Sequence, residues 1–451
     1  MHHTSPGYRL ALRLGHRLLP AVAGLSPKLG RGHAGRLAAC ATMERWATGE
    51  RGLGRGRGRD RSRPLIWFHA SSVGEGLQAE AVLRALREDL PDCQYAYTWF
   101  SPSAERLAAG LPVDVSSYIP YDLTDRVDRA LAALDPTVIV FSKLDLWPEL
   151  ACRARARGAG VVLIAGTVRR GSGRLRWPVR RLLRPGYQAL TAAGAVSAED
   201  GARLVRLGVA GDRIRVTGDP RYDSVVQRVE RAAAEGPVPG LGSEGGPPAL
   251  VAGSTWPADE GVVLEAFSAV RRSHPAARLI VAPHEPHDRH LKALDARAAS
   301  LGLPHPVPLD SASATTELVV VDRVGVLAAV YGAGRMAYVG GAMNSIGIHS
   351  VLEPAAWGVP VAFGPRWDYS RDAGELLAND AARALGEGDP AADLAAAWRG
   401  WLEDETTRRA QGSRARRVVE SGRGGAARNA SLIREALLHD GPFDGHRAGR
   451  Q

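Results

Sequence analysis

Residues 318–365 read LVVVDRVGVLAAVYGAGRMAYVGGAMNSIGIHSVLEPAAWGVPVAFGP, and the spacing of their apolar side chains changes several times. The β-branched run at 318–321 is typical of a strand buried on both faces of a parallel sheet. A helical spacing follows at 326–331, and two further strand-like runs cover 336–339 and 359–363. This alternation of strands and helices predicts an open, parallel α/β sheet.

Gly340 and Gly341 stand at the carboxyl end of the second of these strands, where open α/β sheets bind their ligands. Two missing β-carbons indicate that the backbone approaches another group closely there. A helix starting near His349 would hold that residue in its first turn and Glu353 one turn later on the same face. This geometry fits a nucleotide, with a phosphate at the helix start and Glu353 on the ribose hydroxyls. A tight strand-to-helix turn with a solvated histidine and glutamate fits equally well.

The composition limits the number of domains and the partners. A chain of 451 residues is too long for one compact core, so two domains are expected. The net charge of +10 is carried almost wholly by arginine and suggests anionic lipid, a phosphorylated substrate or nucleic acid. The cysteines Cys40, Cys93 and Cys152 match no metal or disulfide pattern, which fits a reducing compartment.

Three basic segments stand out, and no stretch reaches the roughly 20 apolar residues that span a bilayer. Leucines and arginines share residues 8–19, which predicts a helix resting on a membrane or one packed on its own domain. Residues 51–64 carry six arginines among glycines, as expected of a flexible linker or, alternatively, an RNA-binding segment. Residues 168–187 surround Trp177 and leucines with arginines, as either a lipid-binding surface or a solvated face.

Changes in composition divide the chain into four parts. Residues 1–64 are expected to form a basic membrane-associating segment and linker, and residues 65–235 a Rossmann-like domain. Residues 236–248 are rich in glycine and proline and predict a linker. Residues 249–451 are expected to form a second Rossmann-like domain, with a terminal helix that packs back on the first.

The first domain also carries a ligand loop after a strand. The strand at 65–68 is followed by His69, a turn of small residues and then Glu75 at the start of a helix. The loop therefore offers one carboxylate at a strand's carboxyl end. Glu75 could equally be a first-turn acid that stabilises its helix.

Taken together, these motifs resemble those of the 3-deoxy-D-manno-octulosonic acid (Kdo) transferases of lipopolysaccharide assembly, over nearly the whole chain. The matching stretches are His69-Ala-Ser-Ser-Val-Gly-Glu75, Asp145-Leu-Trp-Pro148, Thr217-Gly-Asp-Pro-Arg-Tyr-Asp223, Ser254-Thr255 with Glu260, Val339-Gly-Gly341, Gly347-Ile-His-Ser-Val-Leu-Glu-Pro354 and Gly364-Pro365. The resemblance implies an α/β fold of two Rossmann-like domains facing across a cleft, the GT-B glycosyltransferase architecture.

The chain departs from the family's pattern at four places. Lys143 stands where the family has an acidic residue, and Ser350 stands where it has an asparagine. The family's Asn-Ala-Arg reads Ala165-Gly166-Thr167 in this chain. The family's Pro-Arg-His reads Pro283-His284-Glu285, with Arg289 as a candidate for the missing cation. Each position bears on recognition of the donor or the acceptor.

The resemblance also implies roles for individual residues. Glu75 would be the catalytic base, with Asp145 as a second catalytic residue. The expected donor-binding residues are Ser254, Thr255, His284, Arg289, Gly340, Gly341, His349, Ser350 and Glu353. The expected acceptor-binding residues are His69, Ser72, Gly74, Lys143, Arg169 and Arg170.

These roles imply an inverting transfer of Kdo from CMP-Kdo to a lipid A precursor in core assembly. The enzyme would make peripheral or monotopic contact with the cytoplasmic face of the bacterial inner membrane. No metal, cofactor or nucleic-acid partner is expected, the nucleotide sugar and the anionic lipid acceptor being substrates. The alternatives are a GT-B enzyme with another donor or acceptor and a catalytically lapsed, binding homologue.

Overall fold

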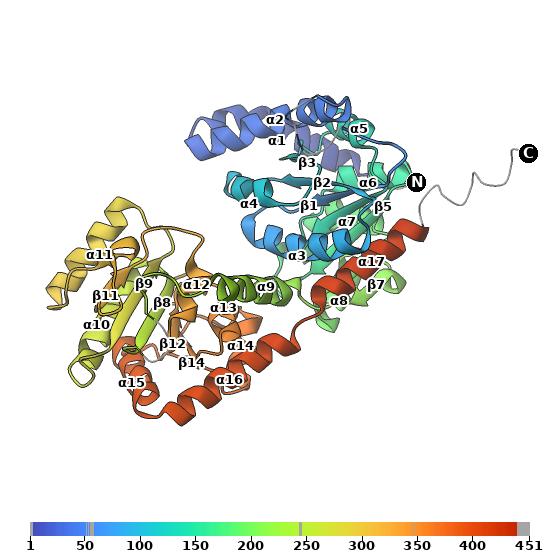
Figure 1. Ribbon diagram of the computed structural model, residues 1–451. Helices are drawn as coiled ribbons and strands as arrows, with labels where there is room; N and C mark the ends of the chain where they lie inside the picture. The colour runs from blue at the N-terminus through green and yellow to red at the C-terminus, as the bar shows by residue number, and fades with distance from the viewer. Residues whose placement is uncertain are drawn as a thin grey trace, which may run out of the picture. The chain divides into compact units, whose positions relative to one another are not determined.

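The computed structural model describes residues 3–50, 52, 54, 58–242, 246–345 and 347–439 (Figure 1). The chain divides into two compact units, Met1–Ser224 with Arg423–Gln451, and Val225–Gly422. This division differs from the predicted one at both ends of the second domain. The boundary falls inside helix α9, Pro220–Glu235, and the terminal helix belongs to the first unit.

A parallel sheet forms the centre of the first unit. Over the described residues its strand order is β3-β2-β1-β4-β5-β6-β7. The strands are β1 Leu65–His69, β2 Gln94–Trp99, β3 Val115–Tyr118, β4 Val138–Ser142, β5 Gly160–Gly166, β6 Ala192–Ala195 and β7 Ile214–Val216. The order reverses between β1 and β4, which makes their carboxyl ends the switch point where ligands of such sheets bind.

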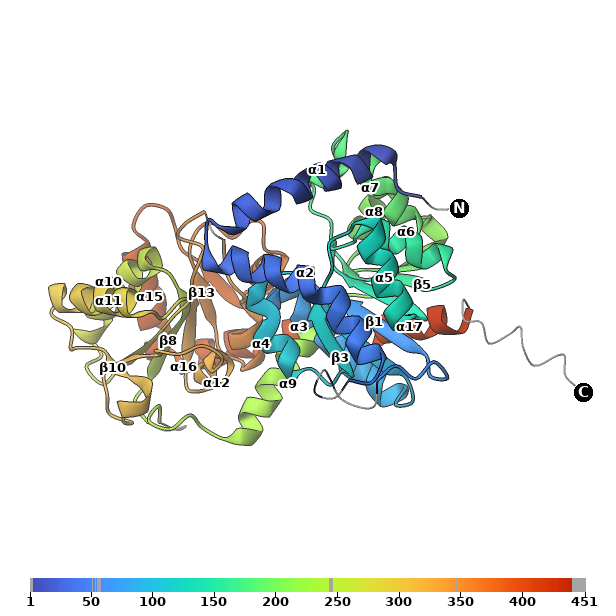
Figure 2. The ribbon, with the colours of Figure 1, turned by 90° about the horizontal axis from the view of Figure 1, so that it is seen from above.

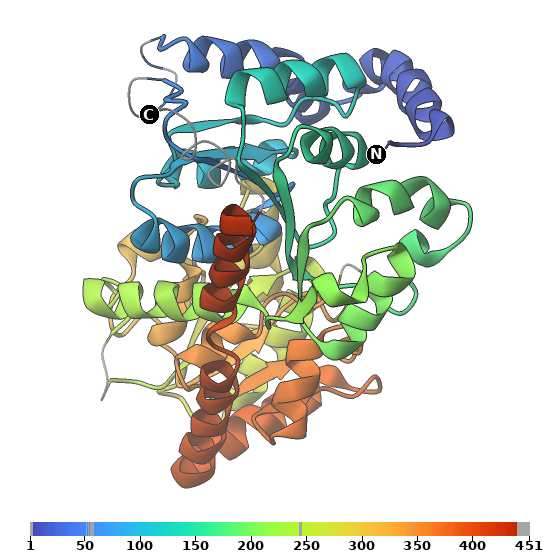
Figure 3. The same ribbon diagram turned by 90° about the vertical axis from the view of Figure 1, so that its right-hand side faces the viewer.

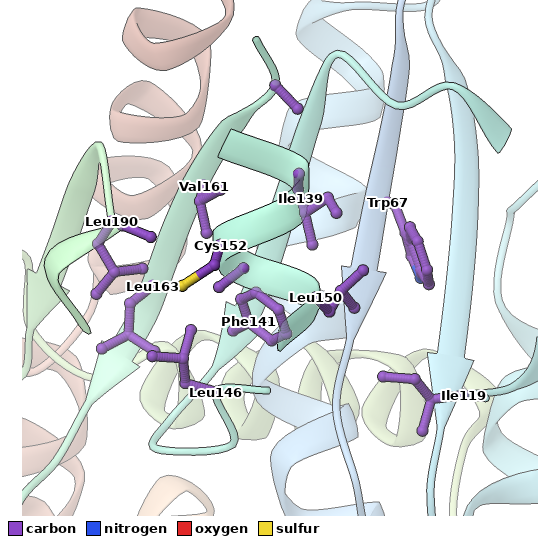
Figure 4. Close-up of a cluster of buried hydrophobic side chains, with 14 of the residues drawn as sticks. Trp67, Ile119, Ile139, Phe141, Leu146, Leu150, Cys152, Val161, Leu163 and Leu190 are labelled. Atoms are coloured by element: carbon purple, nitrogen blue, oxygen red, sulfur yellow. The ribbon is translucent and has the colours of Figure 1, made fainter. Parts of the chain in front are cut away.

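Both faces of the sheet's central part are buried, because alternate residues of β1, β2, β4 and β5 enter two different cores. Trp67 and Phe141 belong to one core, in which Leu150 and Cys152 of helix α6, Pro148–Ala156, pack (Figure 4). Phe68 and the other side chains on the opposite face of the sheet belong to the second core. Because successive side chains point to opposite faces and both faces are buried, these strands appear in the sequence as continuous apolar runs.

Helices cover the two faces of the sheet. Those in the first unit are α1 Pro6–Ala23, α2 Pro27–Ala47, α3 Val73–Asp89, α4 Glu105–Gly110, α5 Thr124–Leu134, α6 Pro148–Ala156, α7 Val179–Gln188, α8 Ala198–Leu207 and α17 Gly425–His439. The last helix, red in Figure 3, packs against α3 and against β4, β5 and β6. Its residues Leu432 and Ile433 are part of the second core.

The N-terminal segment is integrated into the first unit through polar contacts. The Tyr8 hydroxyl donates to Asp122 over 2.7 Å, and Arg9 Nε lies 3.0 Å from a Glu149 carboxylate oxygen. Thr4 also donates to Glu149. Glu149 is buried, and Asp122 accepts the backbone N–H groups of Glu149 and Leu150 at 2.9 and 2.8 Å. The side of α1 that faces the protein thus combines these polar contacts with the half-buried Leu12 and Leu19.

The arginine-rich 51–64 segment lies partly outside the described residues. Its described arginines contact the protein's own backbone and side chains. Arg59 donates to the Leu134 carbonyl at 2.7 Å, Arg61 lies 2.6 Å from Asp135, and Arg63 donates to the Asp92 carbonyl at 2.6 Å. These contacts do not fit the expected freely flexible linker at residues 59–63.

The second unit is built around another parallel sheet. Its strand order, over the part of the chain the structure describes, is β10-β11-β9-β8-β12-β13-β14. The strands are β8 Ala249–Thr255, β9 Arg278–Pro283, β10 Val307–Pro308, β11 Leu318–Val320, β12 Met336–Val339, β13 Val361–Phe363 and β14 Ala382–Ala384. Here the order reverses between β8 and β12.

The helices of the second unit surround that sheet, several of them labelled in Figure 1. They are α10 Pro257–Arg271, α11 Asp288–Ser300, α12 Leu327–Gly332, α13 Leu352–Ala356, α14 Arg371–Ala378, α15 Pro390–Glu403 and α16 Glu405–Ser421. A core around Phe267, Tyr338 and Trp398 joins α10 and α15 to the strands. No helix in the described ranges is long and apolar enough to cross a membrane.

The 236–248 stretch, expected to be a linker, is held by Arg278 where the structure describes it. The Arg278 side chain is buried and donates to the carbonyls of Leu241 and Gly240 at 2.7 and 3.2 Å. It also donates to the Ser313 carbonyl at 2.8 Å. A buried guanidinium satisfied by backbone carbonyls therefore anchors residues 240–241 to the second unit. Residues 243–245 lie outside the described part.

Candidate active site

The candidate catalytic residues of the first unit gather at its switch point. His69 ends β1, Glu75 lies in the first turn of α3, and Lys143 and Asp145 follow β4. Since β1 and β4 pair in parallel, with His69 opposite Phe141, these segments share one edge of the sheet. The motif residues that are distant in sequence are therefore close in space.

Asp145 is held by two side chains of the 69–75 segment. One of its oxygens lies 3.0 Å from Nε2 of the fully buried His69, and it accepts the Ser71 hydroxyl. Burial raises the pKa of Asp145, but the hydrogen bond and charge of His69, together with Ser71 and Arg174, bring it below its ordinary value. His69 Nδ1 lies 3.1 Å from the Thr98 carbonyl. These contacts favour a positioning role for Asp145, which orients the loop that leads to Glu75.

Glu75 is positioned by two residues at the carboxyl end of β4. Its carboxylate lies 3.5 Å from Lys143 Nζ, and its backbone carbonyl accepts the Ser142 hydroxyl at 3.1 Å. Lys143 has φ +63°, a left-handed conformation that a non-glycine residue adopts only under constraint. Ser72 forms no side-chain capping bond at the start of α3. The carboxylate therefore contacts a constrained lysine.

The other predicted acceptor residues lie at the same edge. Ser72, the residue before α3, is half-buried, and Gly74 in the first turn of α3 is exposed. Arg169 and Arg170 are exposed in the segment that follows β5, and β5 pairs with β4. The structure thus brings the predicted acceptor set to three adjacent strand ends.

In the second unit, Ser254-Thr255 and Gly340-Gly341 meet at the switch point. Gly253 pairs with Val339, so the ends of β8 and β12 lie side by side. A β-carbon on Gly340 would stand 2.4 Å from the Ser254 carbonyl oxygen, and Gly341 has φ +98°. Ser254 itself has φ +54°. The close approach that the glycines permit is to the protein's own backbone, so the turn explains both glycines without a ligand.

Asp259, which the sequence does not single out as a site residue, holds this turn. Its buried carboxylate accepts the N–H groups of Gly341 and Trp256, each at 3.0 Å, and the Tyr338 hydroxyl at 2.8 Å. Burial raises the pKa of Asp259 against the opposing effect of these bonds. The only sequence signal is its place in the first turn of the helix after β8.

The adjacent Glu260 holds the neighbouring strand end. It accepts the Thr255 hydroxyl at 2.9 Å, and its two oxygens lie 2.9 and 3.0 Å from His290 Nε2. His290 Nδ1 lies 2.9 Å from the Glu285 carbonyl. Burial raises the pKa of Glu260, and His290 acts in the opposite direction. His290 was not predicted, because nothing in the sequence brings it to Glu260, 30 residues earlier in the chain.

Three aromatic rings gather at the same edge. His284 and His349 stack with ring centroids 4.2 Å apart and planes inclined by 22°, and the Trp256 ring lies 5.0 Å from His284. Trp256 Nε1 donates to His349 Nε2 at 2.9 Å. Burial, with the charge of His284, lowers the pKa of His349 to about 4, and burial lowers the pKa of His284 despite Glu285. Both imidazoles are neutral near pH 7.

The predicted helix start at His349 is wrong. Helix α13 begins at Leu352, because the His349 N–H donates to the Gly340 carbonyl at 3.1 Å and the Ile348 N–H to the Tyr369 hydroxyl at 2.9 Å. His349 is therefore a loop residue. It does not share a helical face with Glu353.

The remaining predicted donor residues are dispersed around this edge. Glu353 lies in α13, and one of its oxygens is 2.9 Å from Arg228 of α9. Ser350 is exposed in the loop before α13, and Arg289 is exposed in the first turn of α11. Among the residues the structure describes, no cluster of histidine, cysteine and acidic side chains is placed to hold a metal ion.

The Thr217–Asp223 motif holds the terminal helix. Asp223 accepts the N–H groups of Gly424 and Ala426, each at 2.8 Å, at the start of α17. Asp219 accepts Gln78 Nε2 at 3.0 Å. This motif fits a structural role in closing the first unit.

Comparisons with known proteins agree with this arrangement. The sequence model of the family described as 3-Deoxy-D-manno-octulosonic-acid transferase (kdotransferase) matches residues 44–224. A 3-deoxy-D-manno-octulosonic acid transferase from Chlamydophila psittaci is 29% identical over 320 residues, covering 70% of this chain and 72% of that protein. One from Bordetella pertussis is 28% identical over 382 residues, covering 80% and 85%.

The fold is similar to that of solved glycosyltransferases. A glycosyltransferase from Rickettsia africae superposes with a TM-score of 0.55 at 10% identity, covering 84% of this chain and 98% of that one. This likeness confirms the predicted fold class of two Rossmann-like α/β domains, the GT-B type. Together, the matched motifs, the family model over residues 44–224 and these relatives support the assignment of this chain to the Kdo transferase family.

Proposed function

We propose that this protein is an inverting glycosyltransferase that moves Kdo from CMP-Kdo to a lipid A precursor during lipopolysaccharide core assembly. The family membership supports the reaction class. The observation that carries the proposal is the position of Glu75, a carboxylate on the edge at which Rossmann-like sheets bind substrates, beside Lys143.

Glu75 acts in this proposal as the general base. It takes the proton of the attacking acceptor hydroxyl while the bond between the sugar and the phosphate oxygen breaks. Proton transfer by a positioned carboxylate contributes about 10²–10⁴-fold to such a rate. The His69–Asp145 pair keeps the segment that ends in Glu75 in place.

The nucleotide sugar binds in this proposal at the glycine turn of the second unit. Its phosphate lies near Ser254, Thr255 and the His284–His349 stack, and Glu353 takes the ribose hydroxyls in competition with Arg228. The proposal includes no metal or other cofactor. Transfer that is insensitive to EDTA is therefore expected.

The test is a transfer assay with CMP-Kdo and a tetraacyl disaccharide lipid, read by the mass of the product. The variant E75Q should lose about 10²–10⁴-fold in rate while its unfolding curve stays close to that of the wild type. The matched control is E80Q in the same helix, whose carboxylate pairs with Arg84 at 2.7 Å and should not be needed. Turnover of E75Q near the wild-type rate would show that another group is the base.

The same assay distinguishes the alternative donor. The departures at His284 and Lys143 lie in the donor and acceptor regions, so another nucleotide sugar is the second candidate. Protection against thermal unfolding by CMP but not by UDP supports CMP-Kdo. The opposite order would favour a uridine-linked donor.

We further propose that α1 and the 168–187 segment rest on anionic lipid at the cytoplasmic face of the inner membrane. Three leucines of α1 are exposed, Leu10, Leu14 and Leu18, with Leu18 at 66%, and so is Leu25 after the helix at 77%. Trp177, just before α7, is 74% exposed, and α7 contacts α1 (Figure 2). Arginines flank both apolar sets, which is the pattern of a surface that enters lipid headgroups.

A further inference from the structure

The hydrogen bond between Trp256 and His349 decides the protonation of one ring in the aromatic cluster. An indole N–H can only donate, so His349 Nε2, 2.9 Å away, must accept. Its single proton is then on Nδ1. Protonation of Nε2 would set two N–H groups against each other, so His349 stays neutral while this bond exists.

His284 has no such constraint. Its backbone N–H donates to the Thr255 carbonyl at 2.9 Å, which ties the residue to the end of β8, but the residue reaches solvent and its ring contacts those of His349 and Trp256 by stacking. The titratable groups that face it are His349 across the stack and Glu285 beside it in the chain. Trp256, from the turn before α10, carries no charge. His284 is therefore the member of the pair that can gain a proton.

An anion beside the stack would change this balance. The neighbouring His349 is neutral, so protonation of His284 brings no charge repulsion within the pair. An opposite charge within about 4–6 Å raises a histidine pKa by roughly 1–3 units, in the direction opposite to the lowering by burial. Cleavage of a nucleotide sugar increases the anionic charge at this position, because a phosphodiester becomes a phosphomonoester dianion.

We propose that His284 takes up one proton from solvent when a phosphomonoester dianion binds beside it, so that nucleotide binding at this edge is linked to proton uptake. The inference rests on the nucleotide site proposed above. It assigns His284 a task that a permanent cation could not perform, since its charge follows the charge of the bound phosphate. The stack would then bind the released nucleotide more tightly at lower pH.

The test is calorimetric titration of the full chain with CMP near pH 8, where the phosphate of CMP is a dianion because its second pKa is about 6. Titrations in buffers of different ionisation enthalpy report the number of protons taken up per CMP. The wild type should take up a measurable fraction of a proton. Cytidine, which lacks the phosphate, should bind without uptake.

Two variants separate this role from a merely structural one. H284Q keeps a polar side chain of similar reach and should abolish uptake while weakening CMP binding by about tenfold, the loss of one charge-assisted hydrogen bond. H284K should also abolish uptake but retain affinity within a few-fold. If the wild type bound CMP without proton uptake, or if uptake persisted in H284Q, the inference would be overturned. The proposed function would not be affected by either result. Failure of the wild type to bind CMP would overturn the proposed donor as well.

Discussion

At the scale of single residues, buried and half-buried carboxylates hold the loops of both units in place. Asp145 is bonded to His69, Asp259 to the glycine turn and Glu260 to His290. Asp122 performs the same task for the N-terminal helix, since it joins Tyr8 to the start of α6. Each joins segments distant in sequence, and a buried acceptor left without its donors would be costly.

Asp122 makes stability depend on pH in a defined direction. Burial raises its pKa from 3.8 to about 6, although hydrogen bonds from Glu149, Tyr8 and Leu150 oppose the rise. A carboxyl whose pKa is higher in the folded state stabilises the protein fully below its unfolded pKa, and this contribution is lost as the pH rises through the folded value. The unfolding free energy of the wild type relative to D122N should fall by about 2 kcal/mol between pH 4 and 6.

Urea unfolding at closely spaced pH values measures this difference. Asparagine cannot titrate, so D122N provides the reference for all other groups. A difference that is constant or rises over the interval would mean that the three hydrogen bonds keep Asp122 ionised in the folded protein.

At the scale of elements, the two short turns that follow β8 and β12 depend on close packing of the backbone. The end of β8 and the end of β12 approach so closely that a side chain on Gly340 has no room. Helix α1 makes polar contacts with the protein and leaves Leu10, Leu14 and Leu18 exposed. Each feature can be tested by a substitution at its site and the same kind of substitution at a control site elsewhere in the chain.

The variant G340A should displace the turn against Ser254, because its β-carbon would stand 2.4 Å from a carbonyl oxygen. Overpacking of this kind destabilises by about 1–3 kcal/mol, and CMP binding should weaken with it. The control is G261A in α10, where no atom lies within 4 Å and alanine should stabilise the helix by about 0.5–1 kcal/mol. Urea unfolding and thermal protection by CMP report both effects. Equal stability of the two variants would contradict the close approach.

The exposed leucines of α1 should determine membrane binding. Replacement of Leu10, Leu14 and Leu18 by asparagine should lower the fraction bound to vesicles with anionic lipid by about tenfold or more, since each buried leucine contributes about 1.5–3 kcal/mol. Vesicle co-sedimentation measures the loss. The control is L438N in α17, a leucine that is 69% exposed but has no basic apolar surface assigned to it. If the triple variant bound vesicles as well as the wild type does, α1 would not be part of the lipid-binding surface.

At the scale of the whole molecule, the first unit is discontinuous in sequence and the second is not. Helix α17 returns to the first unit and contributes Ala430, Leu432 and Ile433 to its core. Asp223 binds the start of this helix through two backbone N–H groups. The second unit has its own sheet and its own core. The two units should therefore respond differently to truncation.

A chain that ends at residue 422 should lose the fold of the first unit. Each buried leucine or isoleucine of α17 stabilises by about 1.5–3 kcal/mol, and a domain has only about 5–15 kcal/mol in total. Residues 220–422, which keep α9 whole, should fold alone and bind CMP. Circular dichroism and calorimetry test both fragments. A cooperative, native-like first unit without residues 423–451 would contradict the role of α17.

The sequence was sufficient to predict several of the strands, the small-residue turns after them and the edge of each sheet at which the motif residues gather. The predicted strands at 65–68 and 336–339 became β1 and β12, and the motif residues after them lie at the switch points. Such features follow from local periodicity and from the rule that parallel strands end together. The cleft between the domains, and the roles of individual site residues, stay predictions.

Only the tertiary structure revealed which residues contact one another across the chain. The pairing of Glu260 with His290, the stack of Trp256, His284 and His349, and the late start of α13 depend on which loops meet after the sheets assemble. Local patterns encode helices and strands because neighbouring residues determine backbone conformation. Contacts between residues far apart in sequence arise when packing brings strand ends together, so they become visible only in the folded protein.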